Sequence, residues 1–203
     1  VAAPRFAWEQ VVAGGDWLLL PIEQLAGRLT ELRADGRDVV LATSEPDEAR
    51  PLTAGYTTPG TLENVSNTAT TTLANSVSVN SLTMRGAAST SLDGTATTPT
   101  VASGAVGSTG ANQSIGSGFS SLILQNGEGF FHVGAGTLTV NTPVNVTGAG
   151  SGGLTKGGGG TVSLTAANVY SGPTTVNAGT LTLSGVSSND TKIYIRGGQL
   201  NFN

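Results

Sequence analysis

The sequence of 203 residues predicts an all-β fold, a parallel β-helix or solenoid, with a small strand–helix–strand segment at its N-terminus. After residue 60 the apolar residues come in pairs separated by one residue, which places two side chains on one face of a short strand. Val162, Leu181 and Leu200 are spaced by nineteen residues, so equivalent strands recur with one period. Thirty glycines, 26 of them after residue 50, supply the sharp turns that such a chain needs.

The internal repeat indicates a solenoid in which each repeat forms one coil and each strand pairs with its equivalents in the neighbouring coils. Roughly seven coils, stacked about 4.8 Å apart between residues 61 and 203, would form a rod about 30 Å long. Thr and Ser are expected on the outside, because stacked like charges would repel each other. The apolar pairs are Val77/Val79, Leu82/Met84, Leu122/Leu124, Leu138/Val140, Val144/Val146, Val162/Leu164, Leu181/Leu183, Ile193/Ile195 and Leu200/Phe202.

Charge and composition both change near residue 50, which predicts three regions. Residues 1–50 hold nine of the thirteen acids and five of the nine bases, and the remainder is almost uncharged. We therefore expect a small α/β capping or docking segment at 1–50, a linker at 51–60 and a β-helix repeat domain at 61–203. Within that domain, residues 87–118 contain few apolar pairs and form either a long coil or a loop that bulges from the rod.

In the first region the pattern predicts a strand, a helix and a second strand. Leu18–Leu20 is a short apolar run, and a helix is expected at 21–35 because Pro21 suits a first turn and the next apolar residues recur at steps of three and four. Gly36 is placed to end that helix. Val39–Leu41 is the second apolar run. Such a segment cannot bury both its faces alone, so it docks on another part or belongs to a larger α/β unit.

Composition excludes several classes of site. With no cysteine there is no disulfide, thiolate zinc site or cysteine nucleophile, and one histidine excludes a multi-histidine metal site. The four acids after residue 50 (Glu63, Asp93, Glu128 and Asp190) are scattered, so no carboxylate pair or calcium site is indicated. No basic run indicates a nucleic-acid surface, and no apolar run approaches a membrane-spanning length. We predict no catalytic, cofactor-binding or metal-ligating residue.

Four local features could suggest a binding or catalytic site, and each has a structural interpretation. Gly148–Gly153 matches G-x-G-x-x-G, but Leu154 and the glycines after Lys156 cannot form the helix that a dinucleotide site requires, so corner glycines are favoured. Lys156 is expected to be an exposed corner residue. His132 is expected to point outward, because Phe131 and Val133 share the opposite face. Tyr170 and Tyr194 are 24 residues apart, which indicates no aligned aromatic ladder.

The stretch Ser151–Gly185 carries a family resemblance. It contains Gly-Gly-Leu-x-Lys, a Gly-Thr-aliphatic strand, Asn-x-Tyr-x-Gly and Thr-Thr-Val-Asn-x-Gly-Thr-Leu, and it resembles the autotransporter-associated β-strand repeat of bacterial surface and secreted proteins. Val79–Leu82 and Gly136–Val140 resemble the degenerate coils that precede such a copy. The resemblance implies a right-handed parallel β-helix stalk that is exported and displayed, and it implies no activity.

These observations favour a non-enzymatic, extracellular or cell-surface β-helix of a bacterium, such as a stalk, an adhesin segment or a self-assembling fibre subunit. Open solenoid ends predict end-to-end self-association, with residues 1–50 covering or bridging the junction. A surface glycan is a further candidate partner. The alternative is a polysaccharide-binding or polysaccharide-cleaving β-helix of the tail-spike or lyase type, and cleavage would require two carboxylates within about 5–10 Å on one open face.

Overall fold

The computed structural model describes residues 6–11, 17–21, 39–42, 50–57, 63–86, 88–149, 152–185 and 192–203. The chain divides into two units, Val1–Glu48 and Ala49–Asn203, which are considered separately below. Among the described residues, no helix has the length and apolar character needed to cross a membrane.

The first unit contains a three-stranded antiparallel sheet of order β2-β1-β3. Its strands are β1 (Phe6–Val11), β2 (Trp17–Pro21) and β3 (Val39–Ala42). The two expected strands correspond to β2 and β3, and the central strand β1 was not predicted from the sequence. Pro21 ends β2, and the remainder of the helix expected at 21–35 lies outside the described residues.

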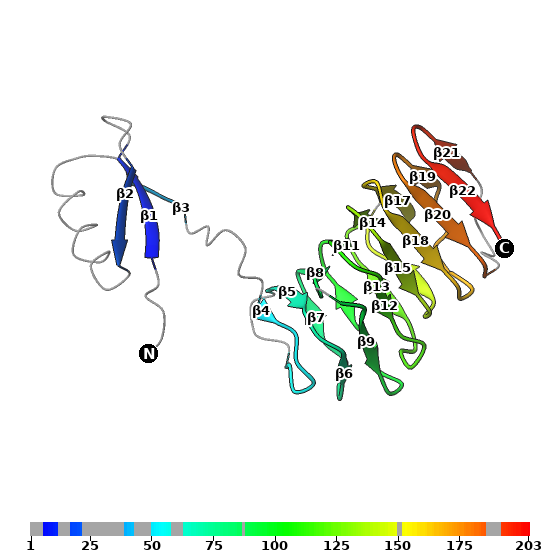
Figure 1. The fold of residues 1–203 in the computed structure, drawn as a ribbon, viewed down its shortest axis with the longest axis horizontal. Coiled ribbons are helices and arrows are strands. Elements are labelled where there is room, and N and C mark those ends of the chain that lie inside the picture. The colour runs from blue at the N-terminus through cyan, green and yellow to red at the C-terminus, as the bar shows by residue number, and fades with distance from the viewer. Residues whose placement is uncertain are drawn as a thin grey trace. The chain divides into compact units, whose positions relative to one another are not determined.

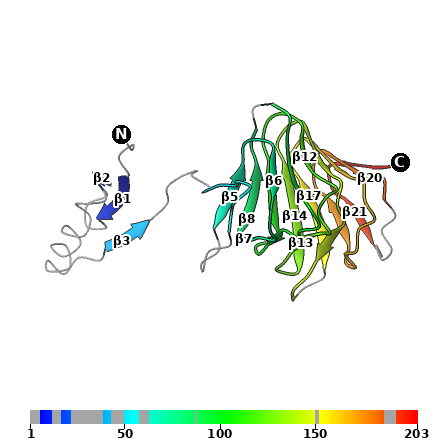
Figure 2. The ribbon, with the colours of Figure 1, turned by 90° about the horizontal axis from the view of Figure 1, so that it is seen from below.

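The second unit is a parallel β-solenoid of about six turns, somewhat fewer than the roughly seven predicted. Within this unit, Figures 1 and 2 show equivalent strands of successive coils lying side by side. The eight-stranded sheet comprises β4 (Arg50–Pro51), β5 (Asn64–Asn67), β8 (Ser81–Met84), β11 (Ala105–Ser108), β14 (Glu128–Val133), β17 (Gly153–Gly157), β19 (Thr174–Val176) and β21 (Ile193–Ile195).

Two further sheets complete the coils. The seven-stranded sheet comprises β6 (Thr71–Leu73), β9 (Thr90–Gly94), β12 (Gln113–Ile115), β15 (Thr137–Val140), β18 (Thr161–Leu164), β20 (Thr180–Leu183) and β22 (Gln199–Phe202). The four-stranded sheet comprises β7 (Ser78–Val79), β10 (Thr100–Val101), β13 (Leu122–Leu124) and β16 (Val144–Val146). Every pair of neighbouring strands in these three sheets is parallel, as a solenoid requires.

The solenoid begins earlier in the chain than the sequence indicated. Arg50–Pro51 forms β4 and pairs with β5, and Leu52 and Tyr56 are buried in the core. The first part of the expected linker at 51–60 therefore packs as a coil, while residues 58–60 lie outside the described residues. Residues 88–118 contribute strands β9 to β12, which pair with strands of the neighbouring coils.

The number of residues in each coil varies, although the sequence suggested a constant period. Along the eight-stranded sheet, stacked inward positions are Val65, Leu82, Val106, Phe131, Lys156, Val176 and Ile195, which gives steps of 17, 24, 25, 25, 20 and 19 residues. The nineteen-residue period thus describes only the end of the solenoid. Coils shorten mainly where the chain passes from the seven-stranded to the eight-stranded sheet, a passage that takes residues 141–152 after β15 and only 165–173 after β18.

The core is a set of inward-facing stacks, and most of the predicted apolar pairs lie in it. The seven pairs from Val77/Val79 to Leu181/Leu183 are buried. Ile193 and Ile195 occupy inward positions by register but are exposed, as is Phe202, because no coil of the described chain lies beyond them. On the outer face of the seven-stranded sheet, hydroxyl side chains form a row: Ser91, Ser114, Thr139, Ser163 and Thr182.

Three-residue corners connect the eight-stranded to the seven-stranded sheet in the later coils, and they require glycine. Gly179 lies in the corner between β19 and β20 with a φ of +65°. A Cβ atom at this position would lie 2.2 Å from the carbonyl oxygen of Gly160, in the corner of the preceding coil. Both the backbone angle and the stacking distance therefore exclude a side chain there.

We expect Leu181→Ala to lower the free energy of unfolding by about 2–5 kcal/mol, because Leu181 is fully buried between Val162 and Leu200 and the surrounding stack cannot close the cavity. The neighbouring Thr182 points outward, and Thr182→Ala should change stability by only about 0.5 kcal/mol. Urea unfolding of both variants measures the difference. Equal effects would contradict the inward and outward assignment of β20.

Candidate functional site

Lys156 is the charged residue whose position differs most from the prediction. It was expected at an exposed corner, and that prediction is wrong: its exposed fraction is 0%. Strand β17 continues to Gly157, so Lys156 lies in the inward stack between Phe131 and Val176. The four glycines that follow Lys156 in the sequence favoured a corner and did not reveal that the strand continues through the lysine.

The buried ammonium group of Lys156 is fully hydrogen-bonded. Its Nζ donates to the carbonyl oxygens of Gly157 at 2.6 Å, Gly158 at 2.8 Å and Ala178 at 3.1 Å. An ammonium has three donors, so each has one acceptor. Gly157 and Gly158 lie at the end of β17 and in its corner, whereas Ala178 lies in the corner of the next coil. Burial lowers the pKa of Lys156, since desolvation disfavours the charged form.

The Asn-x-Tyr-x-Gly motif is also turned inward. Asn168 is buried and its Oδ1 accepts a hydrogen bond from the backbone N–H of Val144 at 3.1 Å, one coil earlier. Tyr170 is fully buried, and its hydroxyl lies 2.9 Å from Oγ1 of Thr174. The polar residues that make this motif recognisable therefore contact the protein interior and are not available to a ligand.

The glycine pattern at 148–153 is followed by a strand, whereas a Rossmann motif is followed by a helix. Gly148 and Gly152 have φ values of +107° and +63°, and the segment leads into strand β17. A dinucleotide site needs the N-terminus of a helix at this point. The positive φ values of Gly148 and Gly152 fit the corner-glycine interpretation.

His132 points outward, as predicted. In β14 the side chains of Phe131 and Val133 are buried while those of Phe130 and His132 are exposed. The rings of Phe130 and His132 stack with centroids 6.4 Å apart and planes inclined by 20°. Gly107 and Gly157 flank His132 in the neighbouring strands, so no side chain covers the pair from those positions.

The acids that the structure describes do not meet. Asp93 lies in β9 of the seven-stranded sheet, where its Oδ1 accepts hydrogen bonds from the N–H groups of Gly94 and Gly118 at 2.8 and 2.9 Å. Glu63 lies next to β5 and Glu128 is the first residue of β14, three coils apart in the eight-stranded sheet, a separation of about 14 Å. Asp190 lies outside the described residues. Within the described ranges, no group of three or more His, Asp or Glu side chains could hold a metal ion.

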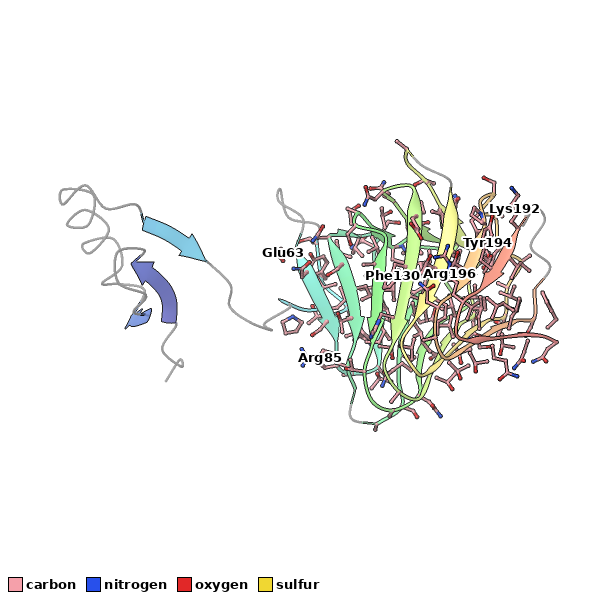
Figure 3. The ribbon with its side chains drawn as sticks, turned by 90° about the horizontal axis from the view of Figure 1, so that it is seen from above. Glu63, Arg85, Phe130, Lys192, Tyr194 and Arg196 are labelled. Carbon is pink, nitrogen blue, oxygen red and sulfur yellow. The ribbon has the colours of Figure 1, made fainter. Side chains whose placement is uncertain are left out.

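Two exposed aromatic residues lie in one row that sequence spacing did not reveal. The register on the outer face of the eight-stranded sheet runs from Phe130 through Thr155 and Thr175 to Tyr194. Figure 3 shows Phe130 and Tyr194 on the same side of the solenoid, with Lys192 and Arg196 beside Tyr194. The residues are 64 apart in sequence, which is the sum of unequal coils, so a search at a constant period could not align them.

The outer face of the seven-stranded sheet carries a different surface. A hollow of about 260 Å³ lies there, and its lining consists only of hydroxyl and amide side chains: Thr70, Ser89, Thr90, Ser91, Asn112, Gln113, Ser114 and Thr139. Gln113 is buried, and its Nε2 donates to the carbonyl oxygens of Gly86 and Ala88. The Nε2 group of Gln113 is thus occupied by backbone hydrogen bonds. The lining of the hollow contains no charged or apolar side chain that could hold a ligand.

Comparison with known proteins identifies the segment that contains Lys156, Asn168 and Tyr170. Residues 154–188 match the passenger-associated-transport-repeat. This match and the β-solenoid together fit autotransporter passenger-like repeat proteins. Searches of curated proteins and of solved structures found no match to the chain.

The match to the passenger-associated-transport-repeat covers nearly two coils here. It begins at Leu154 in β17, passes through β18 and the buried Asn168 and Tyr170, and reaches β19 and β20. Lys156 donates hydrogen bonds to Gly158, in the first corner of the repeat, and to Ala178, in the corner of the following coil. It therefore links the two corners. The polar residues of the repeat thus stabilise the stacking of coils.

We expect Lys156→Ala to lower the free energy of unfolding by about 3 kcal/mol, since it creates a cavity and leaves the carbonyl oxygens of Gly157 and Gly158 without their donor. Lys156→Met fills the space without donating, and should recover about half of that loss. Lys192→Ala, at an exposed position, serves as the control and should have an effect within about 0.5 kcal/mol. Chemical denaturation of the three variants provides the measurement, and similar values for Lys156→Ala and Lys192→Ala would contradict the buried assignment.

Proposed function

We propose that this chain is a non-enzymatic, extracellular structural or adhesive β-helix, a stalk or adhesin segment of a bacterial surface protein. The observation that carries the proposal is the parallel solenoid that contains a passenger-associated-transport-repeat. A right-handed coil is part of the proposal, because parallel β-crossovers are right-handed in nearly all proteins.

The distribution of polar groups supports a scaffolding role. Lys156, Asn168 and Tyr170 are directed into the protein and bond to neighbouring coils or corners. The outer face of the seven-stranded sheet carries a row of uncharged hydroxyl side chains, such as Thr139 and Ser163, which hydrate the surface without repelling each other along the stack. The inward polar residues stabilise the stacked coils. The outer faces of the solenoid remain exposed to solvent and can present a surface to other molecules.

A polysaccharide-cleaving enzyme is the alternative from another class. That chemistry uses two carboxyl groups about 5–10 Å apart. Glu63 and Glu128 are about 14 Å apart by register, and Asp93 lies in a different sheet with its Oδ1 engaged by backbone N–H groups. The described acids therefore favour the structural role over cleavage.

The proposal predicts that the solenoid is displayed outside the cell. An antibody raised against residues 63–203 should label intact cells that express the complete gene, and permeabilising those cells should add little signal. An antibody to a cytoplasmic protein serves as the control and should label only permeabilised cells. Labelling of the solenoid that appears only after permeabilisation would overturn the proposed location.

Self-association is the second part of the proposal. As the described chain stands, the inward positions Ile193 and Ile195 of β21 and Phe202 of β22 are 41%, 56% and 68% exposed. Both strands also present an open hydrogen-bonding edge, which another copy of the chain can extend with parallel strands. Residues 1–50 would then cover or bridge this junction.

We expect the chain to form larger species as its concentration rises, and Ile195→Lys to suppress them because a charge would be buried at the junction. Val169→Lys is the matched control: Val169 is 50% exposed but does not belong to β21 or β22. Sedimentation velocity over a range of concentrations distinguishes the variants. A monomeric wild-type chain at every concentration would exclude self-association while leaving the stalk proposal intact.

A further inference from the structure

The outer face of the eight-stranded sheet carries, over its last four coils, a set of side chains unlike the rest of the solenoid. Phe130 is 38% exposed in β14 and Tyr194 is 43% exposed in β21, whereas most other outward residues are Thr, Ser, Asn or Gly. We name this set the aromatic–basic face and define it by five residues: Phe130, His132, Lys192, Tyr194 and Arg196.

Strand alternation brings the basic residues to the same side as Tyr194. Ile193 and Ile195 occupy inward positions in register with Thr174 and Val176, so Lys192, Tyr194 and Arg196 all project outward. Successive outward side chains on a strand are about 7 Å apart. Figure 3 shows Lys192 and Arg196 beside Tyr194. A ring seated on Tyr194 would therefore lie within reach of an ammonium group and a guanidinium group.

Only short side chains lie between the two aromatic residues along the row. Thr155 and Thr175 occupy the positions between Phe130 and Tyr194, and both have short side chains. Gly157 lies beside His132, and a Cβ atom there would be 3.3 Å from the Phe130 ring. The absence of a side chain at Gly157 leaves room for the stacked rings of Phe130 and His132.

The chemistry of this face fits an extended chain of sugar rings. Aromatic faces carry negative charge density and attract the partially positive C–H groups on one side of a pyranose. Phe130 and Tyr194 are three strand steps apart, about 14 Å, which is the length of about three sugar units. Arg196 and Lys192 add donors for carboxylate or sulfate groups, and Arg can bind such groups with two parallel hydrogen bonds.

We infer that the aromatic–basic face binds an acidic polysaccharide that lies across strands β14 to β21. The ligand would stack on Tyr194 and Phe130 and pair its acidic groups with Arg196 and Lys192. The acid at the other end, Glu128, accepts a hydrogen bond from Thr155 Oγ1 and lies about 14 Å from Lys192 along the stack. This inference rests on the proposed extracellular location, where such polymers occur.

Affinity electrophoresis of the complete chain tests the inference with defined probes. Polygalacturonate supplies carboxylates, dextran sulfate supplies sulfates, and neutral dextran and a single-stranded DNA oligonucleotide are the controls. We expect retardation by one or both acidic polysaccharides, loss of most of it at about 0.5 M salt, and little retardation by dextran or DNA. Comparable binding to DNA would indicate simple charge attraction and overturn the inference, as would no binding to either acidic polysaccharide.

Substitutions in the aromatic–basic face test whether the polysaccharide binds there. Tyr194→Ala and Arg196→Ala should each weaken binding about tenfold, and Arg196→Lys should retain part of it. Arg85→Ala removes an exposed arginine from an earlier coil and should change binding by no more than about twofold. Circular dichroism confirms that each variant keeps its fold. Binding unchanged in both Tyr194→Ala and Arg196→Ala would overturn the assignment of this face, without bearing on whether the solenoid is displayed outside the cell.

Discussion

Stacking of equivalent residues in successive coils is the constraint on which the rest of this structure depends. Parallel strands hydrogen-bonded about 4.8 Å apart place each side chain directly above its equivalent. An inward side chain must therefore pack against its equivalents in the neighbouring coils, and an outward side chain must tolerate their charge. The apolar stacks, the hydroxyl rows and the scarcity of charge in residues 51–203 all follow from this one repeat distance.

The corners obey the same constraint. Gly179 lies so close to the backbone of Gly160 in the preceding coil that only a residue without a Cβ atom fits, and its positive φ has the same requirement. Glycine corners leave backbone carbonyl groups that face the interior, and buried carbonyls need donors. Lys156 supplies three N–H donors to these carbonyl oxygens from inside the coil. These hydrogen bonds explain why a charged residue can occupy a buried stack. A lysine that would be costly alone stabilises two corners together.

In this solenoid the inward residues determine the fold, whereas the outward residues are available for recognition. Because the passenger-associated-transport-repeat uses its polar residues internally, its outward positions can vary without loss of the fold. The aromatic–basic face illustrates this freedom: Phe130 and Tyr194 belong to coils of different length, yet the register aligns them. Recognition on a solenoid therefore depends on which outward residues share a row, and rows depend on the length of every coil between them.

Much of the fold could be predicted from the sequence alone, because local chemistry determines it. Alternating apolar pairs such as Val162 and Leu164 determine strands, and glycines between them determine turns, without reference to the remainder of the chain. The parallel solenoid, the inward pairs and the outward orientation of His132 were determined at this level. The tertiary structure alone decided three features: the inward direction of Lys156, the inclusion of Arg50–Pro51 in a sheet, and the common row of Phe130 and Tyr194. Each depends on hydrogen bonds between residues 15 to 25 positions apart, and the sequence does not reveal which residues will stand above one another when coil lengths vary.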